Sequence, residues 1–194
     1  RRNWGGRRKN AGRKPKNGHK AGVSHGGRPA LSSRHPVHVT LKVKDDLPNL
    51  RSPEVYRAIE GAFFAEQARA ASGEIPKHFR VVHFCVQRDH LHILVEAEGA
   101  ATLSRGMQGL SIRLARGINK AAGRKGSVFA DRFHARVLRT PREVRNCLQY
   151  ILNNTRRHRR RDVFHPRWVD PCSSARYFDG WRGESWRPPA GAWP

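Results

Sequence analysis

The order in which two hydrophobic periodicities alternate along the chain limits its fold more than any other sequence feature. Apolar residues occupy every second position from Val37 to Val43, with polar residues between them, and this spacing predicts a half-buried strand. Three further segments are predicted to be strands: 79–88, 90–97 and 128–139. Apolar residues at helical spacing predict three helices: 53–71, 101–122 and 141–157.

These segments follow one another as strand, helix, strand, strand, helix, strand, helix. Two β-α-β units in this order are typical of the ferredoxin-like arrangement, which belongs to the α+β class. We therefore predict a ferredoxin-like antiparallel sheet with helices on one face. Ser52-Pro53-Glu54 supports the start of the first helix, because it offers a capping residue, a proline at the first position and an early acid.

The two ends of the chain differ from this central region in composition. Residues 1–34 contain no acidic residue and are dominated by Gly, Lys and Arg, which predicts a disordered basic arm. Residues 35–160 hold all the predicted elements and are expected to form one domain. Residues 161–194 are rich in Trp, Pro, Gly and Arg, and we expect a loosely structured C-terminal extension.

The net charge predicts the kind of partner. Lys and Arg number 39 against 15 Asp and Glu, which gives a formal charge of +24. A field of this sign attracts a polyanion, and nucleic acid is the expected partner because Lys and Arg displace its condensed counterions. No apolar run approaches the roughly 20 residues of a membrane span, so we expect no membrane contact.

The cysteines indicate the compartment. Cys85, Cys147 and Cys172 are widely spaced, odd in number and without a CxxC pair. This pattern excludes a disulfide framework and the usual structural zinc sites, and it favours a reducing, cytoplasmic setting. Cys85 and Cys147 lie in apolar stretches and are expected to be small core residues.

A pair of histidines lies within the third predicted strand, at His90-Leu91-His92. Residues two apart in a strand point to the same face, so both imidazoles project side by side while Leu91 enters the core. Paired imidazoles on a rigid strand suit a divalent metal. Two histidines on the wet face of a strand also occur without a metal, so the pattern alone leaves both interpretations open.

The last predicted helix carries Tyr150 and Asn154, which are four residues apart and therefore lie on one face, beside the apolar stripe. A tyrosine there can reach over the sheet. The alternative is an amphipathic boundary residue that packs its ring and exposes its hydroxyl to water.

Basic side chains on the second and third predicted helices and in the fourth predicted strand are candidates for DNA contacts, and those on the second helix could equally form a solvated surface. The candidate DNA-binding residues are Arg113, Arg116, Lys120, Arg132, Arg156 and Arg157.

Two other histidines have open interpretations. His38-Val39-Thr40 matches one half of the paired HxT signature of RNA-ligating cyclic phosphodiesterases, but His90-Leu91-His92 lacks the hydroxyl that the second half requires. His134, in the fourth predicted strand, either approaches the site or faces solvent.

Several segments together resemble a known family. The run from Val86 to Glu96 (VQRDHLHILVE) is similar to the histidine–hydrophobic–histidine (HUH) motif of single-tyrosine transposases. Residues 127–157 resemble the segment of the REP-associated tyrosine transposases that ends in the nucleophile helix, and residues 35–41 resemble that family's opening. The sequence departs from the family where Gln87-Arg88-Asp89 replaces Met-Pro-Asn, and where Thr155-Arg156-Arg157 after Asn154 replaces Pro-Val-Arg.

The resemblance implies a ferredoxin-like fold, a Mg²⁺ or Mn²⁺ ion, and single-stranded or hairpin DNA as substrate. By position, His90, His92 and Asn154 would bind the metal. Tyr150 would be the nucleophile that nicks the strand through a 5′-phosphotyrosine linkage and rejoins it. The alternative is a non-catalytic, domesticated nucleic-acid-binding protein of the same fold. The sequence leaves open the DNA target and whether the protein is a monomer or a homodimer.

Overall fold

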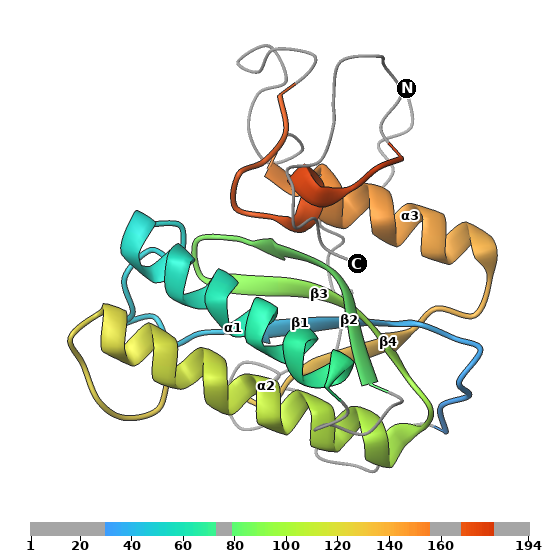
Figure 1. The fold of residues 1–194 in the computed structure, drawn as a ribbon, viewed down its shortest axis with the longest axis horizontal. Coiled ribbons are helices and arrows are strands. Elements are labelled where there is room, and N and C mark those ends of the chain that lie inside the picture. The colour runs from blue at the N-terminus through green and yellow to red at the C-terminus, as the bar shows by residue number, and fades with distance from the viewer. Residues whose placement is uncertain (1–29, 73–78, 156–167, 181–194) are drawn as a thin grey trace, which may run out of the picture.

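The computed structural model describes residues 30–72, 79–155 and 168–180. Its four strands form one antiparallel sheet in the order β2-β3-β1-β4 (Figure 1). The strands are β1 (Val37–Lys42), β2 (Phe79–Val86), β3 (His90–Ala97) and β4 (His134–Val137). The helices are α1 (Pro53–Ala71), α2 (Ala100–Ala121), α3 (Pro141–Leu152) and the short 3-10 helix η2 (Ser174–Tyr177). The order of elements and strands confirms the predicted ferredoxin-like α+β fold.

The two faces of the sheet are covered by different helices, as the alternation of side chains along β3 shows. Leu91, Ile93 and Val95 belong to the main core, which also contains the apolar stripes of α1 and α2. Leu94 points the other way and packs with Ile151 of α3 in a smaller cluster. The predicted single layer of helices therefore holds for α1 and α2, whereas α3 lies on the opposite face (Figure 1).

Helix α3 begins where its sequence directs. Thr140 is the N-cap: its hydroxyl accepts a hydrogen bond from the backbone N–H of Glu143, and the Glu143 carboxylate accepts one from the Thr140 N–H. Pro141 occupies the first turn, where the missing N–H costs nothing. The buried Cys147 and Ile151 then hold the helix against the sheet. This reciprocal cap fixes where the helix starts and therefore which side chains face the strands.

The segment 168–180 covers the exposed edge of β2. The backbone N–H of Val86 donates to the carbonyl of Cys172 over 2.9 Å, and Ser173 forms a bridge with Cys85. Ser173, Ser174 and Ala175 are fully buried. We expected loose packing from residue 161 onward, and for residues 168–180 that expectation is wrong, because this segment protects an otherwise unpaired strand edge.

Several expectations fall outside the described residues. The basic arm is described only from residue 30 onward, and Arg156 and Arg157 belong to a range, 156–167, that the structure does not describe.

Cys85, Cys147 and Cys172 are all buried without a disulfide, which confirms Cys85 and Cys147 as core residues. Within the described ranges, no helix is both long and apolar enough to cross a membrane.

Candidate active site

The register of the strands gathers polar side chains on the face of the sheet that carries α3. Thr40 of β1 pairs with His92 of β3 on one side and with His134 of β4 on the other. Residues paired across antiparallel strands share a face, so these three form a row across the sheet. The neighbouring rows on this face contain Lys42, His90, His38 and Arg136. Because α3 packs mainly against β2 and β3, the part of this face over β1 and β4 stays polar.

His92 lies at the centre of the cluster and is 6 % exposed. Its Nε2 atom is 3.1 Å from Nε2 of His90 and 3.1 Å from the hydroxyl oxygen of Tyr150. On the other side of the ring, its Nδ1 atom is 3.1 Å from Nε2 of His38 and 3.4 Å from the hydroxyl oxygen of Thr40. The structure therefore links Tyr150 and His90 through His92, which contacts both of them.

The hydrogen-bond partners of His90 determine its tautomer. Its Nδ1 atom is 2.7 Å from a carboxylate oxygen of Asp89, and the contact with His90 lowers the pKa of that carboxyl group. An ionised carboxylate can only accept, so Nδ1 of His90 donates to Asp89, which in the neutral ring leaves the lone pair at Nε2. That lone pair points toward His92.

The surroundings of His92 likewise favour a proton on Nδ1 and a lone pair on Nε2. Burial lowers the pKa of His38 to about 4, assisted by His134 and Arg136, so this imidazole is neutral at ordinary pH. A neutral His38 and the hydroxyl of Thr40 can both accept the Nδ1 proton of His92. The lone pair of His92 Nε2 is then directed toward His90 and Tyr150.

The residues fit a divalent cation. Two nitrogens that bind one cation at about 2.1 Å, at a tetrahedral or octahedral angle, lie roughly 3.0–3.4 Å apart, and the two Nε2 atoms are 3.1 Å apart. Asn154 follows α3 and is fully buried, and neither polar atom of its amide has a hydrogen-bond partner in the described structure. Such an orphaned amide suits a ligand oxygen. No three His, Cys, Asp or Glu side chains of the described residues converge as a metal-binding group, so a third ligand would have to be of another kind, such as an amide oxygen or water.

Tyr150 reaches the histidines because α3 presents it beside its buried stripe. Ile151 is fully buried and Tyr150, the preceding residue, is half-buried on the flank of the same cluster. The tyrosine ring meets the His92 ring edge to face, with centroids 4.9 Å apart. The phenol is therefore held by packing and directed at the imidazole pair, which is the spatial relation that the sequence analysis requires.

The predicted DNA-binding residues are not gathered at this site. Arg113, Arg116 and Lys120 belong to α2, on the opposite face of the sheet. Arg113 forms an ion pair with the buried Glu66, while Arg116 and Lys120 are exposed. Arg132 is half-buried in the loop before β4. Whether any of these residues contacts DNA stays a prediction.

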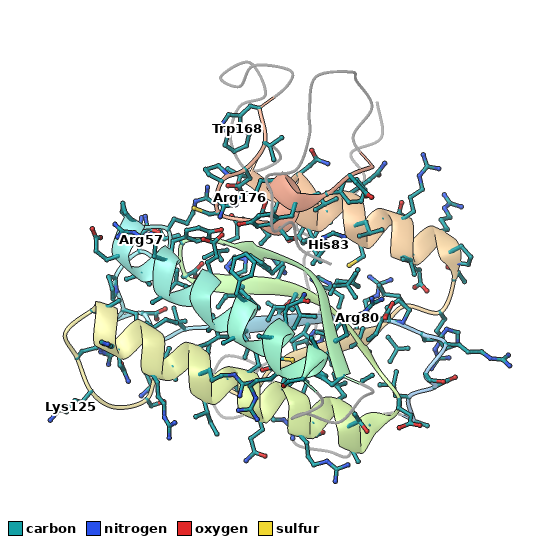
Figure 2. All side chains as sticks on the ribbon, in the orientation of Figure 1. Arg57, Arg80, His83, Lys125, Trp168 and Arg176 are labelled. Carbon is teal, nitrogen blue, oxygen red and sulfur yellow. The ribbon has the colours of Figure 1, made fainter. Side chains whose placement is uncertain are left out.

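Positive charge does not by itself locate a binding path. The exposed Arg57, Arg80 and Lys125 come from α1, β2 and the loop after α2, and basic side chains project from many parts of the surface (Figure 2). The candidate site is instead identified by the contacts among His90, His92 and Tyr150.

Two contributors were missed by sequence reasoning. His38 contacts His92, and the one signal for it was the His38-Val39-Thr40 pattern, which was considered only as half of a phosphodiesterase signature. Asp170, 2 % exposed, accepts hydrogen bonds from both terminal nitrogens of Arg51 and from Thr155, the residue after Asn154. No local pattern links Asp170 to the end of α3, because the contact joins distant parts of the chain.

The fold and the site together define a ferredoxin-like protein in which a helix tyrosine contacts one of two neighbouring histidines from one strand. The sequence model of the family described as "Transposase IS200 like" matches residues 59–154, about half of the chain, and this range includes Tyr150, Asn154 and both histidines. The chain belongs to this family of transposases.

Several solved structures are similar to the chain, and two of them are transposases. A REP-associated tyrosine transposase bound to a REP hairpin shares 18 % identity, with 70 % of this chain and 74 % of that chain covered and a TM-score of 0.54. A candidate transposase from Deinococcus radiodurans R1 shares 18 % identity over 68 % of this chain and 93 % of that chain, with a TM-score of 0.39. The first of these likenesses supports the fold. No curated protein matches the sequence.

Proposed function

We propose that this transposase cuts single-stranded or hairpin DNA with Tyr150 as the nucleophile and rejoins the strand through a 5′-phosphotyrosine intermediate. One observation carries the proposal: the phenol oxygen of Tyr150 lies 3.1 Å from His92 Nε2, which lies 3.1 Å from His90 Nε2. A phosphate placed against the imidazole pair would therefore also be within reach of the phenol. We assign the protein to the REP-associated group on its sequence resemblance.

The side chains have separate roles in this proposal. Tyr150 supplies the attacking oxygen, and its contact with His92 holds that oxygen beside the position of the phosphate. His90, His92 and Asn154 would hold a Mg²⁺ or Mn²⁺ ion. When bound, the ion would polarise the phosphate and offset the negative charge that develops on it. Asp89, Thr40 and His38 orient the two imidazoles through the nitrogen that faces away from the phosphate.

The chemistry conserves both bonds and protons. The phenol oxygen forms a bond to phosphorus while the bond from phosphorus to the 3′ oxygen breaks. The proton lost by the phenol is balanced by the proton gained by the departing 3′ hydroxyl. One phosphodiester replaces another, so attack by a 3′ hydroxyl on the linkage rejoins a strand without ATP.

We propose DNA as the substrate and partner on two grounds. The chain carries a formal charge of +24, and the similar tyrosine transposase was solved with a REP hairpin. Arg132, Arg116 and Lys120 remain our candidates for phosphate contacts, as do Arg156 and Arg157, which lie outside the described residues. Because Arg113 is engaged by Glu66, its contribution would require that pair to open. We propose the cytoplasm as the location of the protein.

The decisive experiment is capture of the covalent intermediate. The protein is incubated with 5′- or 3′-labelled hairpin DNA carrying single-stranded flanks, with Mn²⁺, and denatured. We expect a labelled protein–DNA adduct when the label lies 3′ of the cut, because the 5′ phosphate stays on the protein. In Tyr150→Phe the adduct should vanish, since phenylalanine keeps the packing and lacks the attacking oxygen.

Tyr177→Phe is the matched control. Tyr177 belongs to η2 and its hydroxyl contacts Glu60, far in the fold from the histidine pair, so this variant should form the adduct at the wild-type level. Tight DNA binding without an adduct in any divalent metal would instead support the non-catalytic binding protein. An adduct that persists in Tyr150→Phe would refute the assignment of the nucleophile.

A further inference from the structure

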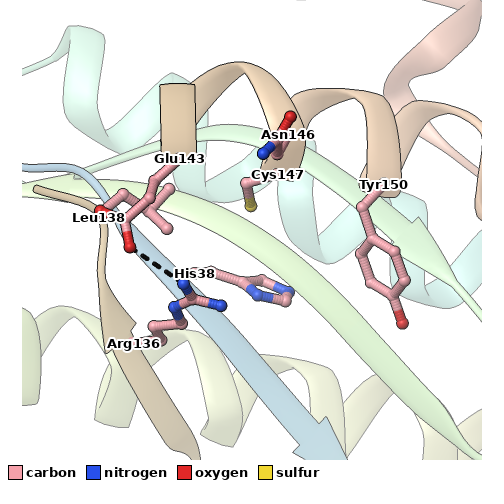
Figure 3. Close-up of a pocket in the computed structure, with 7 residues that line it drawn as sticks. All are labelled: His38, Arg136, Leu138, Glu143, Asn146, Cys147 and Tyr150. Carbon is pink, nitrogen blue, oxygen red and sulfur yellow. Dashed lines mark hydrogen bonds and ion pairs between the residues drawn. The ribbon is translucent and has the colours of Figure 1, made fainter. Parts of the chain in front are cut away.

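A pocket of about 350 Å³ borders the candidate active site, between α3 and the part of the sheet formed by β1 and β4 (Figure 3). His38 of β1 and Arg136 of β4 form its sheet side, and Asn146, Cys147 and Tyr150 form its helix side. Its volume is near the lower limit of pockets that hold small organic molecules, about 300 Å³. The space therefore suits one nucleotide unit and excludes a double helix.

The lining combines flat rings with an apolar floor. The rings of His38 and Tyr150 stand edge to face with centroids 5.9 Å apart, and Figure 3 shows both beneath α3. The floor is apolar, because Leu138 and Cys147 are buried. Unpaired nucleobases bind proteins by stacking on aromatic rings and by hydrogen bonds at their edges. Asn146, at the exposed rim, offers a neutral amide that can both donate and accept.

The charged groups of the pocket do not repel a nucleotide. Glu143 is the one carboxylate in the lining, and Nη2 of Arg136 donates to it over 2.9 Å. The carboxylate also accepts hydrogen bonds from the backbone N–H groups of Arg139 and Thr140 at the start of α3. It is thus committed to the helix cap, and the pocket is open to a base whose phosphate lies outside.

The pocket is connected to the proposed site of cleavage by one side chain. Tyr150 lines the pocket, and its hydroxyl contacts His92. His38 is shared in the same way, because it lines the pocket and contacts the opposite nitrogen of His92. A strand that places one phosphate at the imidazole pair therefore carries a neighbouring base to the mouth of the pocket.

We infer that this pocket binds the nucleobase of a single-stranded nucleotide next to the scissile phosphate. The inference rests on the proposed function only in placing the base beside the phosphate that is cut. Binding of the base itself does not depend on cleavage. It adds to the phosphate chemistry a contact that distinguishes unpaired from paired DNA, because a paired base cannot leave its partner to enter the pocket without an energetic cost.

The test compares two labelled single strands of equal length and charge, an oligothymidylate and the same backbone without bases. Fluorescence anisotropy is measured in EDTA, so no cleavage is required. For the wild-type protein we expect the strand with bases to bind about tenfold more tightly, the size of a stacking contribution. Asn146→Trp fills the pocket and should reduce this difference to less than about twofold while leaving the affinity for the abasic strand unchanged.

Gln149→Trp is the matched control, because it places the same ring on an exposed position of α3 that does not line the pocket. This variant should keep the tenfold difference. The inference is overturned if the wild-type protein binds both strands equally, or if Asn146→Trp retains the same preference as Gln149→Trp. Failure of the proposed function has a different signature, namely the absence of a Tyr150-dependent adduct, and either result can occur without the other.

Discussion

His90 shows how a single neighbour prepares a side chain for a role. The carboxylate of Asp89, 2.7 Å away, accepts a hydrogen bond from Nδ1, so the neutral ring presents its lone pair at Nε2. His92 presents its own Nε2 atom 3.1 Å away. Two lone pairs directed at one another repel unless a proton or a cation lies between them. The arrangement therefore favours a proton or a cation between the two Nε2 atoms.

We predict that His90→Ala lowers cleavage by more than about 100-fold, because even residues that merely orient metal ligands contribute 10- to 100-fold. Binding of hairpin DNA should change less than about threefold, since the net positive charge carries most of the affinity. Cleavage is measured from the adduct and binding by gel shift.

His134→Ala is the control for this variant, because His134 is an exposed imidazole on the same face of the sheet, in β4. It should retain cleavage. Equal loss of binding and cleavage in His90→Ala, together with a lowered melting temperature, would show that His90 is structural.

The sequence was informative about single residues where the signal is local. The alternation of Leu91 with His90 and His92 follows from strand geometry, and the structure confirms that Leu91 is in the core while His92 faces α3. The contact of His38 with His92 could not be predicted, because it depends on the register between β1 and β3, which are separated by a whole helix and a strand.

At the scale of elements, α3 is held at both ends. The Thr140 cap fixes its first turn, and Thr155 at its other end donates to the buried Asp170. Asp170 is in turn held by Arg51, whose Nη2 atom donates over 2.7 Å, and by the backbone N–H of Cys172. This network anchors the end of α3 next to Asn154, the proposed third ligand.

We predict that Asp170→Asn lowers the free energy of unfolding by about 2–3 kcal/mol, because it leaves the half-buried guanidinium of Arg51 without its charge partner. Cleavage should fall as well, since the residues that follow α3, Asn154 among them, lose their anchor. Urea denaturation followed by circular dichroism measures the first effect, and the adduct assay measures the second.

Asp179→Asn tests the same change at an exposed carboxylate of the same segment, and it should alter the free energy of unfolding by less than about 0.5 kcal/mol. The anchor would be disproved by equal midpoints of denaturation for the two variants.

The face of the sheet that α3 covers and the packing of residues 168–180 were predicted wrongly for related physical reasons. A helix with an apolar stripe must cover some apolar surface, but its sequence does not state which face of the sheet provides it. The small cluster around Cys85, Leu94 and Ile151 provides that surface opposite α1 and α2. The buried segment 168–180 was missed for a related reason, since its backbone pairs with β2 through small side chains such as Ser173 and Ala175 that give no hydrophobic pattern.

For the whole molecule, chemistry and charge are distributed differently. The candidate site uses imidazoles, an amide and a phenol, whereas the formal charge of +24 is spread along the chain. Residues 1–29 alone contain 10 Lys and Arg and no acidic residue. Affinity for DNA and the chemical step should therefore be separable by removing that segment.

We predict that a protein lacking residues 1–29 binds hairpin DNA more weakly and with a smaller dependence on salt. Leu31 packs against the core, so the deletion stops before it and leaves the fold intact. Each lost phosphate contact reduces the slope of log affinity against log salt by about 0.7–0.9. If half of the 10 Lys and Arg of residues 1–29 contact phosphates, the deletion should lower the slope by about 4. Anisotropy titrations at several salt concentrations between about 50 and 300 mM measure the slope.

At saturating DNA, the shortened protein should form the Tyr150 adduct at the wild-type rate, because none of the site residues has been removed. An unchanged slope would show that these residues do not touch the DNA, and a lower rate at saturation would show that they help to position the strand for attack.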